Sequence, residues 1–305
     1  MTGMRHLDAA EVSARVSMAE LIPVIGEALD AVEQGEFDMP GRLSFGGRVL
    51  VMPAYHPATR SGSVKVVTVD FQRVPAISGA VTWTSPRMEF LADAPRITAL
   101  RTGAIVGRAT DLLAPPSASR VVLIGTGAQA ADQVRAVAAV RDIRELVIVG
   151  RRKERADRLG HLITGEFPHL RVRTTDGIAA AVSEAEIVCC ATSATEPLFS
   201  LSDLPARVHV NAIGSYTPAM RELPAELLSD AEVVAVESVE AATTEAGEII
   251  HALDTGRLTV DALTPLARIQ PGAVSRGRTV FKSVGIAAQD WAVCRLLEQS
   301  LSAGS

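Results

Sequence analysis

The sequence predicts an α/β protein in which a doubly wound parallel sheet is joined to a discontinuous α+β domain. From Arg120 onward, short apolar runs alternate with helical stretches, as they do in βαβ units. Before residue 118 the apolar runs follow one another with turn residues between them, and a last apolar helix follows the alternating region. We expect that helix to return to the first domain. The predicted domains are therefore 1–118 with 283–305, and 119–282.

Cap and turn residues predict the elements of the first domain. Ser17 and Glu20 have the spacing of a capping box, and apolar residues at helical spacing follow as far as Gly35. Pro23 lies inside this stretch, so the helix either kinks there or begins at Ile22. Strands are expected at Arg48–Met52, Val64–Val69 and Ala80–Trp83, and a helix at Ile97–Leu113, which Pro115-Pro-Ser117 ends.

The turn that opens the second domain has a dinucleotide-binding signature. Val121–Ile124 predicts a buried strand, which runs into Gly125-Thr-Gly-Ala-Gln-Ala130 and an Ala-rich helix. Gly125 permits the sharp turn, Gly127 lets the backbone approach a pyrophosphate, and Ala130 is the small residue where helix packs on strand. Together with the free amide groups at the helix start, this turn predicts a Rossmann domain that binds a nucleotide.

The alternation of strands and helices continues to the C-terminal region. Further strands are expected at 145–149, 170–174, 186–191, 207–213 and 231–236, and helices at 128–140, at 153–165 and from about Val284 to Leu301.

The end of the second Rossmann strand indicates which dinucleotide binds. At that position an Asp or Glu accepts hydrogen bonds from the ribose 2′-hydroxyl of NAD, whereas a 2′-phosphate requires cations. Here Glu145–Val149 is followed by Gly150-Arg-Arg-Lys-Glu-Arg155, with no carboxylate directly after the strand. We therefore expect NADPH rather than NADH, with Arg151 as the planar partner of the phosphate. The alternative is that the basic residues after this strand are solvated and bind no phosphate.

Three basic residues and one acidic residue are candidates for chemistry. Lys65 shares a strand face with apolar residues, which is costly unless the ammonium is paired; an edge-strand lysine that reaches water is the alternative. Arg101 is expected in the first turn of its helix, where a cation opposes the helix dipole unless an anion binds there too; a solvated arginine is the alternative. Arg42 is a third candidate. For Asp290, capping or pairing within the last helix is favoured over catalysis.

Composition and charge argue against several classes of protein. Of the 305 residues 48% are hydrophobic and 21% charged, as in a globular enzyme, and the net charge of −5 leaves no basic face for nucleic acid or an anionic membrane. No apolar stretch approaches a membrane span and the N-terminus lacks the core of a signal peptide, so we expect a cytoplasmic protein. Cys189, Cys190 and Cys294 are expected to be buried thiols, and the histidines lack metal-ligand spacing.

Seven short segments carry a family resemblance through their order and spacing. They are Val51–Ala54, Val64–Val67, Ile97–Ala104, Ile124–Ala130, Ala191–Ser193, Gly214–Leu223 and Val280–Gly285. Together they resemble the ornithine cyclodeaminase/mu-crystallin family over nearly the whole chain. The resemblance implies a Rossmann domain plus a discontinuous substrate-binding domain that dimerises through its sheet, and hence a homodimer.

The resemblance also implies roles for individual residues. In the family, the arginines that match Arg42 and Arg101 hold the substrate carboxylate. The lysine that matches Lys65 polarises the reacting group or supplies a proton, so Lys65 is the expected catalytic residue. The expected cofactor-binding residues combine those of the glycine turn and the second strand with positions that line the cofactor in the family. They are Gly125, Gly127, Ala128, Gln129, Gly150, Arg151, Arg152, Arg155, Ala191, Thr192, Gly214, Tyr216, Ser283 and Val284.

Two departures from the family pattern bear on the expected reaction. Tyr216 stands where cyclodeaminases have an Asp that engages the substrate amine, and a phenol cannot replace a carboxylate near an ammonium at neutral pH. The stretch Asp70–Pro95 lacks the usual Pro-x-Asn and aspartate-bearing turn, which leaves the pocket shape open.

The resemblance favours an NADPH-dependent reductase of a small imino acid, a cyclic ketimine such as Δ1-pyrroline-2-carboxylate. The alternatives are an alanine-type amino-acid dehydrogenase, an ornithine cyclodeaminase and, outside enzymes, an NADPH-dependent ligand-binding protein like mu-crystallin.

Overall fold

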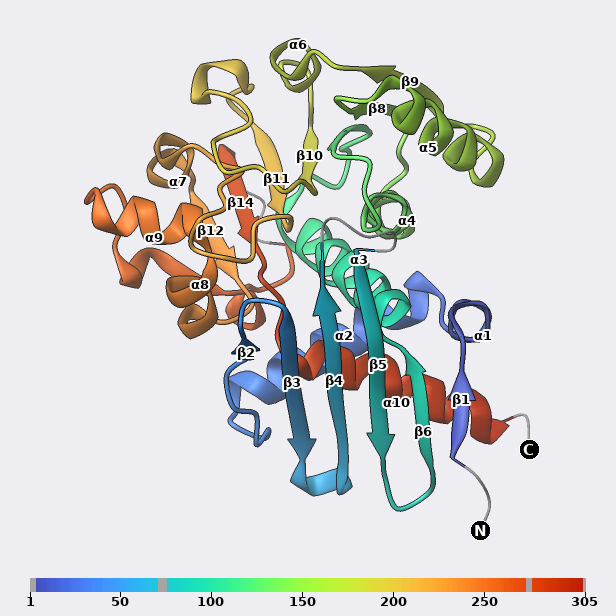
Figure 1. Ribbon diagram of the computed structural model, residues 1–305. Helices are drawn as coiled ribbons and strands as arrows, with labels where there is room; N and C mark the ends of the chain where they lie inside the picture. The colour runs from blue at the N-terminus through green and yellow to red at the C-terminus, as the bar shows by residue number, and fades with distance from the viewer. Residues whose placement is uncertain (1–3, 71–75, 273–275, 304–305) are drawn as a thin grey trace. The chain divides into compact units, whose positions relative to one another are not determined.

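The computed structural model describes residues 4–70, 76–272 and 276–303, which form two compact units (Figure 1). Unit 1 runs up to Ile105 and resumes at Ile286, and unit 2 is Val106–Gly285. The division falls within helix α3 (Ala94–Leu113). The boundaries of the functional domains, expected near residues 118 and 282, remain a prediction.

Unit 1 is built on a mixed six-stranded sheet in the order β1-β6-β5-β4-β3-β2. β1 pairs with β6 in parallel, and the other neighbours are antiparallel. Helix α10 packs against α2, β3 and β4. The elements are β1 (Arg5–Leu7), α1 (Ala9–Arg15), α2 (Met18–Glu33), β2 (Leu43–Phe45), β3 (Val49–His56), β4 (Ser61–Val69), β5 (Ile77–Thr84), β6 (Glu89–Asp93) and α10 (Ala287–Ala303). Strands β5 and β6 lie in the unusual stretch Asp70–Pro95, of which 71–75 fall outside the described residues.

The first long helix begins at its capping box. The Ser17 hydroxyl accepts the backbone N–H of Glu20, and the Glu20 carboxylate accepts the N–H of Ser17, so α2 begins at Met18. Pro23 lies inside the helix, and the alternative start at Ile22 was therefore wrong.

Unit 2 is a doubly wound domain with an eight-stranded, all-parallel sheet, which confirms the predicted fold class. The strand order is β13-β12-β14-β11-β10-β7-β8-β9. The strands are β7 (Arg120–Ile124), β8 (Glu145–Val149), β9 (Arg171–Thr175), β10 (Ile187–Cys190), β11 (Val208–Ala212), β12 (Val233–Val236), β13 (Leu263–Pro265) and β14 (Arg278–Lys282). The helices between them are α4 (Ala130–Val140), α5 (Lys153–Glu166), α6 (Ile178–Val182), α7 (Ala225–Asp230), α8 (Val239–Glu245) and α9 (Gly247–Asp254).

Helices α3 and α10 begin at residues other than those predicted, for reasons that the contacts show. α3 begins at Ala94 instead of Ile97, because the Asp93 carboxylate accepts the N–H of Arg96 at 2.7 Å and caps the first turn. α10 begins at Ala287 instead of Val284, because the N–H of Val284 is directed to a carboxylate of unit 2. Among the described residues, no helix combines the length and apolar character that crossing a membrane requires.

Candidate active site

Unit 1 contains a buried ion pair between β4 and α10. Lys65 Nζ lies 3.0 Å from Asp290 Oδ1 and 2.8 Å from Oδ2, and the two side chains are 3% and 0% exposed. Lys65 points inward because residues alternate along β4, and β4 is paired on both sides, with β3 and β5. The interpretation of Lys65 as an edge-strand lysine was therefore wrong. The pairing of Asp290 within its own helix was wrong too, since its partner lies on a distant strand.

Arg101 joins this pair from helix α3. Its Nη1 donates to Gln289 Oε1 at 2.7 Å, and its Nε lies 3.6 Å from Asp290 Oδ1. Because α3 begins at Ala94, Arg101 lies well beyond the first turn, and the argument from the helix dipole was wrong. The helix N-terminus therefore does not contribute to binding an anion at Arg101, and only the buried guanidinium beside Lys65 can do so.

The site carries more positive than negative charge. Burial lowers the pKa of Lys65 to about 8; the charge of Asp290 opposes this effect, and the charges of Arg101 and Arg42 add to it. The charge of Arg42 therefore reaches the same ammonium, while the direct contacts join Lys65, Arg101 and Asp290. Two arginine charges beside a buried lysine suit an anionic ligand and an ammonium able to give up its proton near neutral pH.

The glycine turn of unit 2 fits a pyrophosphate. Gly125 has φ +118°, and a Cβ there would lie 2.3 Å from the carbonyl oxygen of Ala191. A Cβ on Gly127 would meet nothing within 4 Å, so the turn is open on that side. Ala128 and Gln129 precede α4, which begins at Ala130 and not at 128. The buried Oε1 of Gln129 has no hydrogen-bond partner among the described residues.

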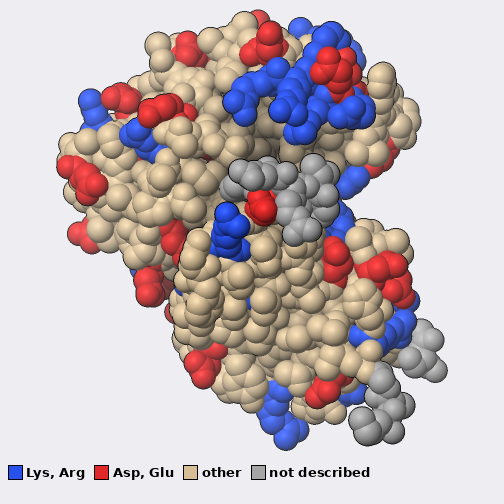
Figure 2. All heavy atoms as spheres, viewed as in Figure 1, with Lys and Arg blue, Asp and Glu red and all other residues tan. Residues whose placement is uncertain are grey.

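The end of β8 presents exposed cations. A Cβ on Gly150 would lie 2.8 Å from Thr126 Cγ2, so a larger residue does not fit beside the turn. Arg151, Arg152 and Arg155 are exposed, and no ion pair among the described residues involves them. Figure 2 shows lysine and arginine side chains gathered over β8, β9 and α5.

A buried carboxylate joins the loops that follow β10 and β11. Glu222 Oε1 accepts the N–H and hydroxyl of Thr192 at 2.7 and 2.9 Å, and its Oε2 accepts the N–H of Gly214 at 2.7 Å. A Cβ on Gly214 would lie 2.6 Å from this carboxylate, so only glycine fits. Tyr216 follows, half-buried against the apolar core of unit 2.

A second carboxylate holds the segment after β14. Glu237 Oε1 accepts the hydroxyl of Ser283 at 3.0 Å and the N–H groups of Val284 and Gly285 at 2.7 and 2.5 Å. Sequence reasoning missed both Glu222 and Glu237. The available signal was the position of Glu237 directly after the apolar strand β12, because polar residues at the carboxyl ends of parallel strands line the binding edge.

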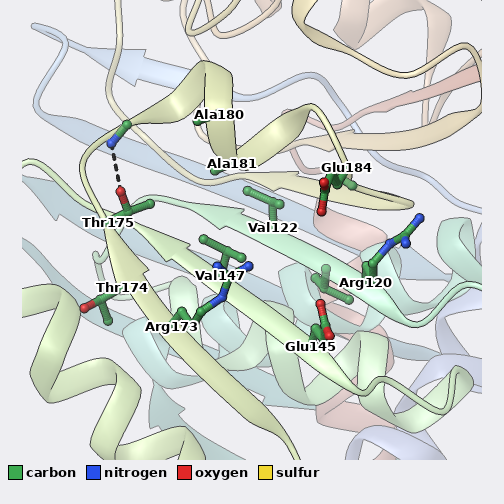
Figure 3. A pocket seen from close by; sticks show the side chains of 13 residues that line it. Arg120, Val122, Glu145, Val147, Arg173, Thr174, Thr175, Ala180, Ala181 and Glu184 are labelled. Atoms are coloured by element: carbon green, nitrogen blue, oxygen red, sulfur yellow. Dashed lines mark hydrogen bonds between the residues drawn. The ribbon is translucent and has the colours of Figure 1, made fainter.

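One cavity of unit 2 is separate from these residues. It measures about 310 Å³ and lies over β7, β8 and β9 beside α6, with Val122 and Val147 as apolar lining and Arg120, Glu145, Arg173 and Glu184 as charged lining (Figure 3). None of the predicted site residues lines it. Among the described residues, no group of three or more His, Cys, Asp or Glu side chains could hold a metal ion.

Comparison with known proteins shows relatives over the full length of the chain. The model of the ornithine cyclodeaminase/mu-crystallin family matches residues 4–305. The chain is 34% identical to Delta(1)-pyrroline-2-carboxylate reductase of Bacillus cereus, over 99% of this chain and 98% of the relative.

Two solved structures have the same fold throughout. Delta(1)-pyrroline-2-carboxylate reductase of Thermococcus litoralis, in complex with NADH and L-proline, matches with a TM-score of 0.91 and 25% identity, over 99% of this chain and 98% of that one. An archaeal alanine dehydrogenase dimer with bound NAD matches with a TM-score of 0.87 and 27% identity, over 99% and 97%. This chain therefore belongs to the ornithine cyclodeaminase/mu-crystallin family, and it is an NAD(P)H-dependent oxidoreductase.

Proposed function

We propose that this protein reduces a small cyclic ketimine carboxylate, such as Δ1-pyrroline-2-carboxylate, with NADPH. The observation that carries the proposal is the buried cluster of Lys65, Arg101 and Asp290, with the charge of Arg42 acting on it. Its positive surplus suits a carboxylate, and its lysine suits proton transfer to a neighbouring nitrogen. The Bacillus and Thermococcus relatives named for this substrate support the same class.

Each residue of the cluster has a distinct part in the proposed reaction. Arg42 and Arg101 hold the substrate carboxylate and fix the position of the adjacent C=N group. When bound, the nicotinamide cofactor would supply the hydride that the imine carbon receives. Lys65 gives its proton to the imine nitrogen, so that the C=N double bond becomes CH–NH. The neutral Lys65 side chain then regains a proton from solvent. Asp290 holds the ammonium in place and favours its charged form.

A substrate panel tests the proposal. Consumption of NADPH and NADH is followed by absorbance with Δ1-pyrroline-2-carboxylate, its six-membered homologue, pyruvate with ammonia, and ornithine. We expect turnover of one or both cyclic ketimines without added ammonia. Activity only with pyruvate and free ammonia would instead support an alanine-type dehydrogenase, which the similarity to the archaeal enzyme makes the second candidate.

The preference for NADPH is tested by Arg151→Asp. The exposed guanidinium at the end of β8 is proposed to bind the 2′-phosphate, together with Arg152 and Arg155. Removing it should weaken NADPH binding about 10- to 100-fold, the scale of a lost charged hydrogen bond of roughly 1.5–3 kcal/mol. Fluorescence titration measures this loss of affinity. NADH, which has no 2′-phosphate for Arg151 to bind, is the internal control. Equal effects on both cofactors would contradict the role of Arg151.

The outer face of the unit 1 sheet is proposed to form a homodimer. Five large apolar side chains lie on that face, at 37–59% exposure: Leu43, Phe45, Tyr55, Val64 and Val66. An exposed apolar patch on a sheet typically marks a protein interface, and a second copy presents the same patch.

Val66→Arg should convert the dimer to a monomer, because it places an unpaired charge in the centre of this face. Sedimentation velocity measures the change. Leu162→Arg, at an equally exposed apolar position of α5, is the matched control and should leave the dimer intact. A Val66→Arg variant that sediments as a dimer would place the interface elsewhere.

A further inference from the structure

Four charged side chains are buried at the carboxyl edge of the unit 2 sheet. Glu222, Glu237, Glu248 and Lys282 are 0%, 5%, 1% and 0% exposed. The strand register places Lys282 of β14 beside Ala212 at the end of β11 and Val236 at the end of β12. The loops that Glu222 and Glu237 hold follow β10, β11 and β14, which are neighbours in the sheet.

Glu222 and Glu237 accept hydrogen bonds from the loops around them. Both oxygens of Glu222 accept bonds, from Thr192 on one side and from Gly214 and Ser215 on the other. Three donors converge on Oε1 of Glu237, and its buried Oε2 has no partner among the described residues. Because both oxygens of Glu222 accept backbone N–H groups and neither donates, the contacts of Glu222 fit the deprotonated form.

This cluster of four side chains contains three carboxyl groups and one cation, Lys282. Lys282 Nζ lies 3.4 Å from Glu248 Oε1 and also donates to the backbone oxygen and hydroxyl of Ser215. Among the described residues, no Lys or Arg forms an ion pair with Glu222 or Glu237. Burial raises the pKa of Glu222, which the charge of Lys282 opposes, so holding this carboxylate ionised is a cost to the fold. The cluster therefore carries surplus negative charge where little water screens it.

The position of this charge gives it an effect on the cofactor. In a doubly wound domain the adenosine half of a dinucleotide lies at the glycine turn and the second strand, and the other nucleotide falls to the second half of the sheet. In unit 2 that half consists of β10, β11, β14 and β12. In the cofactor site proposed above, the nicotinamide ring would therefore lie at the carboxyl edge of this half. This ring is neutral when reduced and cationic when oxidised.

We propose that Glu222 and Glu237 stabilise the oxidised nicotinamide relative to the reduced one, and so make the bound cofactor a stronger hydride donor. The inference rests on the cofactor site proposed above. Loss of a hydride turns the neutral ring into a cation, and a fixed negative field lowers the free energy of that product. The two glutamates are thus positioning residues with an electrostatic effect, and they contact neither the hydride nor the imine.

The test compares affinities for the two redox states without any imine present. Dissociation constants for NADPH and NADP⁺ are measured by calorimetric titration for the wild type, Glu237→Gln and Glu237→Asp. For Glu237→Gln we expect the ratio of the NADP⁺ constant to the NADPH constant to rise roughly three- to tenfold, the scale of one buried charge at an effective dielectric constant of about 20. Glu237→Asp keeps the charge, and its ratio should stay near that of the wild type even if both affinities fall.

A matched control and a second variant separate the outcomes. Asp132→Asn removes a buried carboxylate from the first turn of α4, beside the pyrophosphate turn, and should change both constants by the same factor. Should Glu237→Gln not fold, Glu222→Gln provides the same comparison. Equal weakening of both redox states by the glutamine variants would overturn the electrostatic role and leave only loop positioning. A wild type that binds neither NADPH nor NADP⁺ would instead refute the proposed cofactor site.

Discussion

Replacing Lys65 with methionine is expected to lower kcat for the ketimine about 100-fold or more, the usual scale for loss of a general acid. Methionine keeps much of the volume of the lysine stem but has no proton to give. The imine nitrogen would then have to take its proton from water, without a group held in position. Single-turnover absorbance measurements at saturating substrate give the rate of the chemical step directly.

Binding measurements show whether the Lys65→Met effect is local. The proposed cofactor-binding residues lie in unit 2, so NADPH affinity should be unchanged in the variant. A fall in kcat with intact cofactor affinity assigns the loss to chemistry. A variant that keeps near-full turnover would remove Lys65 from the mechanism, and the acid would have to be sought elsewhere.

Local sequence signals predicted most of unit 2. The run Val121–Ile124 and the turn at Gly125 specify strand, turn and helix within a dozen residues, and the other parallel strands follow the same apolar pattern. The capping box at Ser17 also predicted its helix, although Pro23 suggested a later start. Pro23 removes one backbone hydrogen bond from the second turn, and the burial of the apolar face of α2 outweighs this local cost.

The wrong predictions for Lys65, Asp290 and the start of α10 share a physical cause, which is contact across a long sequence separation. Asp290 lies 225 residues after Lys65, and only the packing of α10 on β4 brings the two together. Without that contact, pairing within the helix is the natural choice for Asp290 and solvent exposure is the natural choice for Lys65. A long-range contact also sets where α10 begins. The N–H groups of Val284 and Gly285 donate to the Glu237 carboxylate, so the helix begins only at Ala287.

Replacing Asp290 with asparagine is expected to move the basic limb of the pH profile of kcat/KM to lower pH. A reaction that needs the Lys65 ammonium proceeds below the pKa of Lys65 and fades as pH rises through it, which is about 8 in the wild type. Asp290 raises this pKa through its charge and its hydrogen bond, against burial and the two arginines. Without the carboxylate the pKa falls further, so the limb should shift downward by about one pH unit or more.

The direction of that shift distinguishes proton control from general damage to the fold. Removing one partner of a buried pair costs roughly 3–5 kcal/mol of stability, so Asp290→Asn should also unfold at a lower temperature. Lost stability alone lowers activity at every pH and leaves the limb in place. Glu298→Gln is the matched control, since this buried carboxylate of α10 accepts a bond from Ser85 and contacts no cation of the cluster. A limb that stayed near pH 8 in Asp290→Asn would mean that Lys65 does not set the pH dependence, whatever the variant did to turnover.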